Sequence, residues 1–169
     1  MEAPVLTGDR GQDTYEALVA FATRQGLTVT THDPKTDGED TQSTYNGYNS
    51  PSRKLIFVKR AAPAQMVKTL AHELAHHLDP ERQAAPRAEC ETVAEATAFV
   101  VAAHHTIDTG SYSFPYIATW ASRHDGPALL KQVMGRVQAI AHRVIAGITP
   151  ADQPAEEGAD LPAADRLAA

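Results

Sequence analysis

TLAHELAHHL, residues Thr69–Leu78, is the most informative stretch of the chain. It contains the pattern His-Glu-x-x-His at His72, Glu73 and His76. Histidines four residues apart lie one turn apart on the same face of a helix, so both imidazoles can bind one metal ion. Glu73 occupies the position of a general base for a water that the metal activates. We therefore expect a helix that carries a catalytic metal site.

The composition is that of an ordinary globular domain, with 169 residues, 43% hydrophobic and 21% charged. A formal net charge of −6 does not support nucleic-acid binding. The single cysteine, Cys90, excludes an internal disulfide. The sequence contains no apolar run near the roughly 20 residues of a membrane span and no pattern of a signal peptide at its start. We expect a cytoplasmic protein without membrane contact.

Periodicity and turn residues predict an α+β fold, in which a small β-sheet packs on a helical body. The expected helices cover 13–25, 63–78, 86–105, 114–123 and 127–146, and the expected strands cover 27–31, 43–48 and 54–59. Residues 1–149 form the expected domain. Residues 150–169, rich in Ala, Pro, Asp and Glu, are expected to be a disordered acidic tail.

The stretch KLIFVK, residues 54–59, is the clearest strand. Its apolar run is typical of a strand buried on both faces or at an inner position of a small sheet. If it were an edge strand instead, an extended peptide substrate would be able to pair with it.

The helix after the metal-binding motif carries Glu91 and Glu95 one turn apart on one face. Like charges at this spacing repel by roughly 0.2–0.5 kcal/mol unless a cation neutralises them. The helix is apolar from Val93 onward, so Glu95 at its buried edge needs a partner or a metal. Glu95 follows His76 by nineteen residues, and this spacing, with the Glu-Ala-x-x-Phe context, resembles the glutamate zincins.

We therefore expect His72, His76 and Glu95 to be the metal ligands, with one coordination position left open for water. Glu91 is the alternative third ligand, or a residue that orients a ligand histidine. Two further histidines, at 104 and 105, are suitable by type but poorly spaced.

The tetrahedral oxyanion of an acyl-transfer reaction needs a further hydrogen-bond donor. Tyr112 and Tyr116 are candidates, because they follow the second helix in a turn. Either tyrosine is also compatible with a purely structural role.

Three segments in order, KTLAHELAHHL, ETVAEATAFVV and DTGSYSFPYIATWAS, resemble the ImmA/IrrE-type zinc metallopeptidases, and in particular the metallopeptidase domain of ArdC-like antirestriction proteins. The resemblance is strongest over 56–122. It implies a zincin-like fold, one zinc ion, and metal-site roles for His72, Glu73, His76 and Glu95. ArdC-like proteins carry a separate single-stranded-DNA-binding domain ahead of the peptidase, for which these 169 residues have no room. DNA binding and antirestriction activity are therefore not expected.

The leading hypothesis is a zinc-dependent metallopeptidase that cleaves a specific protein, such as a transcriptional repressor or a regulator of a mobile element. The alternative is a non-catalytic, zinc-stabilised binding or regulatory module of a mobile element, in which Glu73 is dispensable. A third interpretation is a helical domain that binds no metal and contains the motif by chance. Two histidines and a carboxylate also suit divalent ions other than zinc.

Overall fold

A computed structural model describes residues 11–32, 45–110 and 126–149. These residues form an α+β structure with a small sheet, as the sequence predicted, and they contain four α-helices and three strands. The helices are α1 (Gln12–Arg24), α2 (Pro63–Leu78), α3 (Arg87–His104) and α5 (Gly126–Ile148), the strands are β1 (Thr28–His32), β2 (Gly47–Ser50) and β3 (Leu55–Lys59), and a short 3₁₀ helix, η1 (Pro51–Arg53), joins β2 to β3. The expected helix at 114–123, the expected tail at 150–169 and the first residues of the predicted domain lie outside the described residues.

The sheet has the strand order β1-β3-β2, with β1 parallel and β2 antiparallel to β3. β3 is therefore central, and the option that residues 54–59 form an edge strand is wrong, whereas the inner position is confirmed. Ile56 and Val58 are fully buried against the helices, while Phe57 between them is on the opposite face. Among the described strands, β2 is an edge strand on the side of α2.

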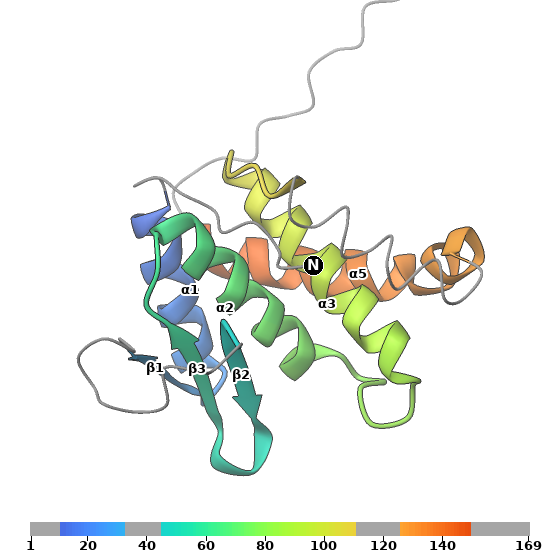
Figure 1. Cartoon of the computed structure of the whole chain (residues 1–169), viewed down its shortest axis with the longest axis horizontal. Coiled ribbons are helices and arrows are strands. Elements are labelled where there is room, and N and C mark those ends of the chain that lie inside the picture. Colours follow the sequence, from blue (N-terminus) through green and yellow to red (C-terminus); the bar gives the residue numbers. More distant parts are fainter. Residues whose placement is uncertain (1–10, 33–44, 111–125, 150–169) are drawn as a thin grey trace, which may run out of the picture.

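α2 is at the centre of the molecule, with β2 and β3 on one side and α3 on the other (Figure 1). Pro63 starts the helix, because the missing N–H of proline is tolerated in the first turn. Leu70 and Leu74 are fully buried and attach the helix to the core. The helix ends before Asp79, whose extended backbone suits a residue that precedes a proline.

Gly47 allows β2 to approach α2 closely. A Cβ at this position would be 2.6 Å from Cγ2 of Thr69 and 2.8 Å from the carbonyl oxygen of Phe57. The latter is a backbone atom of the neighbouring strand and cannot move aside cheaply. The glycine therefore places the edge strand directly beside the helix that carries the His-Glu-x-x-His motif.

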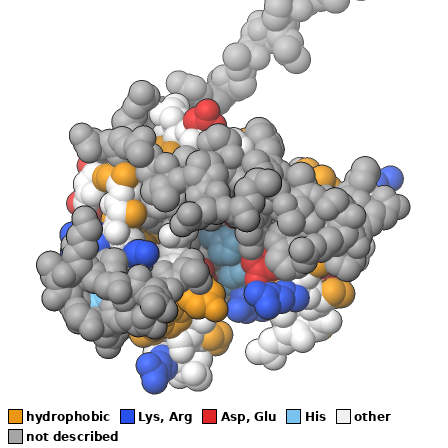
Figure 2. Space-filling model, in the orientation of Figure 1, with side chains coloured by type: hydrophobic (Ala, Val, Ile, Leu, Met, Phe, Trp, Pro, Cys, Tyr) orange, Lys and Arg blue, Asp and Glu red, His pale blue; other side chains and the backbone are white. Residues whose placement is uncertain are grey.

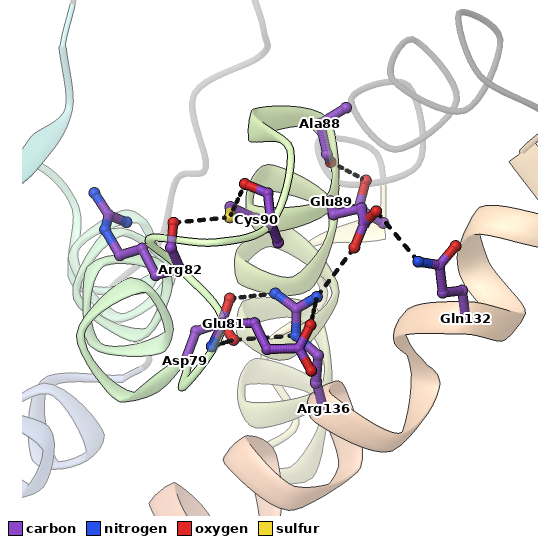
Figure 3. Close-up of polar contacts among 10 residues, drawn as sticks. Asp79, Glu81, Arg82, Ala88, Glu89, Cys90, Gln132 and Arg136 are labelled. Carbon is purple, nitrogen blue, oxygen red and sulfur yellow. Dashed lines mark hydrogen bonds and ion pairs between the residues drawn. The ribbon is translucent and has the colours of Figure 1, made fainter.

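Arg136 on α5 connects the end of α2 to α3 (Figure 3). Its guanidinium donates two hydrogen bonds to the carboxylate of Asp79, from Nε at 3.0 Å and from Nη2. Nη1 donates to Oε2 of Glu89 at 3.2 Å, and Oε2 of Glu81 lies 3.3 Å away. A planar guanidinium can satisfy several carboxylates at once, so this cluster sets how α3 and α5 lie against the end of α2.

None of the helices in the described ranges is long and apolar enough to cross a membrane.

Candidate metal centre

His72 and His76 from α2 and Glu91 from α3 form a group in which one ligand atom of each residue lies within 4.8 Å of the others. Oε2 of Glu91 is 3.7 Å from Nε2 of His72 and 3.8 Å from Nε2 of His76. Tetrahedral zinc, with bonds of about 2.0–2.2 Å, places neighbouring ligand atoms about 3.4 Å apart. Both distances from the carboxylate to the imidazoles are therefore within a few tenths of an ångström of the separation that a shared zinc ion requires.

The geometry favours Glu91 over Glu95 as the third ligand, which reverses the preference drawn from sequence spacing. Oε2 of Glu95 lies 2.9 Å from Nζ of Lys68 and 3.3 Å from Nδ1 of His72. Glu95 is thus next to Nδ1 of His72, whereas Glu91 is nearer to the other ring nitrogen, Nε2. A carboxylate in this place orients a ligand histidine, which is the role that the sequence analysis gave to Glu91 as an alternative.

Lys68 is the residue of the site that sequence reasoning missed. It precedes His72 by one helical turn, is only 4% exposed, and donates a hydrogen bond to Glu95. Burial lowers the pKa of Lys68, while the nearby Glu95 and Glu73 raise it in part. The signal that could have identified it is a lysine four residues before His72, on the helix face that carries the histidines.

Glu73 is 8% exposed and is in the same pocket as the histidines. Burial raises the pKa of its carboxyl group, and the neighbouring His72 and His76 lower it in part. A carboxylate with a raised pKa is a stronger base, as a residue that accepts a proton near neutral pH must be.

The cluster borders a pocket of about 360 Å³. Side chains of α2 and α3 form one wall, and residues 45–49, which include the start of β2, form the other. Figure 2 shows histidine side chains in a hollow of this face, with acidic side chains next to them and basic side chains below. The pocket is thus open to solvent and combines both charge signs around the imidazoles.

The alternative histidine ligands, His104 and His105, do not join this cluster. Within the described part of the chain, His72, His76 and Glu91 are the only group of three or more potential ligands. His104 and His105 contact each other edge to face, with ring centroids 5.0 Å apart, at the end of α3. The two candidate oxyanion donors, the tyrosines at 112 and 116, lie outside the described residues.

Comparison with known proteins gave no match to a family model, to a curated protein or to a solved structure. The site must therefore be interpreted from its own geometry.

Proposed function

We propose that the protein is a zinc-dependent metallopeptidase with a zincin-like fold, in which His72, His76 and Glu91 bind the metal. The observation that carries the proposal is the convergence of these three donor atoms within 4.8 Å in a pocket that also contains the buried carboxylate of Glu73. The donor set of two imidazoles and one carboxylate is that of catalytic rather than structural zinc sites, since it leaves a position open. The resemblance to the ImmA/IrrE-type peptidases supports the proposed activity and the roles of His72, Glu73 and His76, whereas for the third ligand it implies Glu95 in place of Glu91.

When bound, the zinc ion supplies the Lewis acidity that activates water and polarises the scissile carbonyl. Glu73 accepts the proton that the attacking water releases and returns it to the leaving nitrogen. Glu95, in contact with Nδ1 of His72 and with Lys68, holds that imidazole in the orientation in which Nε2 faces Glu91.

The substrate is proposed to be an extended segment of a specific protein, such as a transcriptional repressor. β2 is the edge strand beside the pocket, and an edge strand presents free N–H and C=O groups with which a peptide can pair. This moves the expected pairing strand from β3 to β2. The short, four-residue β2 suits recognition of a short stretch of substrate.

The test is metal analysis and peptide hydrolysis on protein purified without added metal. About one zinc per chain is expected, and cleavage of a proteome-derived peptide library, read by mass spectrometry, should be lost in Glu73→Gln with the zinc retained. The matched control is Glu16→Gln, an exposed glutamate on α1 that should cleave at the wild-type rate. Undiminished cleavage by Glu73→Gln would exclude it as the base. A wild-type protein that binds zinc, unfolds on chelation and cleaves nothing would instead be a non-catalytic module.

A further inference from the structure

We propose that Asn49 binds the peptide backbone of the substrate through its side-chain amide. The inference rests on the proposed peptidase function and adds to it a positioning residue for the substrate. Asn49 is in the edge strand β2 and borders the pocket that contains the histidine cluster. Its Nδ2 and Oδ1 atoms are both buried, and neither has a hydrogen-bond partner among the residues that the structure describes.

The register of the sheet explains where this amide is directed. Asn49 is opposite the fully buried Ile56, so its side chain is on the face of the sheet that packs against the helices. Gly47, two residues earlier, is on the same face and approaches Thr69 of α2. Tyr48, between them, is directed to the other face and stacks on Phe57, with centroids 5.1 Å apart. The amide of Asn49 is therefore on the α2 side of the edge strand, where the pocket is.

Burial of the Asn49 amide without hydrogen bonds costs free energy, which indicates that the residue contributes to ligand binding rather than to the stability of the fold. Asparagine is disfavoured in strands, and a buried amide without partners loses its hydrogen bonds to water with nothing in return. Native structures contain few such groups, and each one calls for an explanation. An apolar residue of similar size would suit the fold better at this position.

The chemistry of the amide identifies the ligand class. A carboxamide offers two donor hydrogens and one acceptor in a plane, which matches the N–H and C=O groups of a peptide. Because the amide of Asn49 is neutral, it also leaves the net charge of the candidate metal site unchanged. An extended peptide next to β2 would bring unpaired backbone groups to this amide, and would satisfy both Nδ2 and Oδ1.

The experiment compares wild type with Asn49→Leu, which has the same approximate size and no polar atoms, and with Asn49→Asp, which keeps the acceptor and removes the donor. For the best-cleaved peptide of the library, KM should rise about 10- to 100-fold in Asn49→Leu with kcat changed less than about threefold, because a lost pair of hydrogen bonds weakens binding rather than chemistry. Zinc content should stay at the wild-type value, and the urea midpoint of the zinc-loaded, peptide-free protein should increase. Ser50→Ala, next in β2 and outside the pocket lining, is the control and should leave KM unchanged.

A second measurement separates binding from turnover. In the Glu73→Gln background, the affinity of zinc-loaded protein for the same fluorescent peptide should decrease by a similar factor when Asn49→Leu is added. If KM and peptide affinity are unchanged in both Asn49 variants while wild type cleaves the peptide, the role of Asn49 is refuted and the peptidase function stands. If Asn49→Leu lowers stability and leaves KM unchanged, the amide is structural. If wild type cleaves no peptide, the peptidase function fails, and the role of Asn49 fails with it.

Discussion

Oε2 of Glu95 lies 3.3 Å from Nδ1 of His72, while the other ring nitrogen of the same imidazole lies 3.7 Å from Glu91. Each ring nitrogen of this imidazole is thus near a different carboxylate of α3. This arrangement gives the two glutamates different roles, although they are one turn apart.

Substitution of each glutamate should separate these roles. Glu91→Ala should abolish stoichiometric zinc binding, because it removes a ligand. Glu95→Gln should retain zinc with an affinity about 10- to 100-fold lower, the usual effect of losing a residue that orients a ligand histidine. Competition with a chromogenic chelator measures both. A larger loss in Glu95→Gln than in Glu91→Ala would restore Glu95 as the ligand.

The buried ion pair between Lys68 and Glu95 makes a prediction about stability. Lys68→Met leaves the carboxylate of Glu95, which is 1% exposed, without its ammonium partner. Removal of one partner of a buried ion pair lowers the free energy of unfolding by about 3–5 kcal/mol. Urea unfolding of the zinc-free protein should show this loss, and the double variant Lys68→Met with Glu95→Gln should recover part of it. The control is Lys131→Met, at an exposed lysine. An equal loss of stability in this variant would show that the Lys68–Glu95 ion pair is not the cause.

The helix that carries the His-Glu-x-x-His motif was predictable from the sequence, because its local signals agree. The His-Glu-x-x-His spacing, the leucines at four-residue intervals and Pro63 at the start all indicate one helix, and α2 has the expected bounds, Pro63–Leu78. The sequence left the position of β3 in the sheet undecided, because a short apolar run does not distinguish a strand buried on both faces from a central strand of a half-exposed sheet.

The sequence could not distinguish Glu91 from Glu95 as the third candidate ligand, for a different reason. Both glutamates are on one face of α3, so helical spacing alone brings either within reach of α2. The decision depends on how α3 lies along α2, which the contacts of Arg136 with Asp79 and Glu89 hold in place. Such long-range contacts leave no periodic pattern in the sequence.

Two glycines of α5 should respond in opposite directions to alanine. A Cβ at Gly147 would be 2.4 Å from two ring atoms of Phe21, a core residue that is 3% exposed. Overpacking of this kind costs about 1–3 kcal/mol and should exceed the helix-propensity gain of about 1 kcal/mol. Beyond its own helix backbone and chain neighbours, no atom of the described residues lies within 4 Å of a Cβ built at Gly135, so Gly135→Ala should be stabilising. Thermal unfolding of both variants provides the comparison, and a gain in both would show that α1 and α5 are less tightly packed than described.

Arg136 should be among the positions most sensitive to substitution outside the candidate metal centre. Arg136→Met removes the cation shared by Asp79 and Glu89 and leaves the carboxylate of Asp79, 1% exposed, uncompensated. A loss of about 3–5 kcal/mol is expected in the free energy of unfolding. Arg143→Met, at an exposed site of the same helix, should lose less than about 1 kcal/mol. Similar urea midpoints for the two variants would contradict a structural role for the Arg136 cluster.

His105, which follows α3, should contribute to acid sensitivity. Burial, and secondarily the adjacent His104, lower the pKa of His105 below 6.5, and its Nε2 is buried without a hydrogen-bond partner in the described ranges 11–32, 45–110 and 126–149. The folded state therefore favours the neutral ring, and the unfolded chain takes up the proton first as the pH falls. The stability that His105 contributes is fully present above pH 6.5 and is lost as the pH falls through its lowered pKa.

In zinc-free protein, His105→Leu should thus show a smaller decrease in urea midpoint from pH 7.5 to 5.5 than wild type, whereas His142→Leu, exposed on α5, should follow wild type. An unchanged decrease in His105→Leu would assign the acid sensitivity to other groups, since the remaining histidines are common to all three proteins.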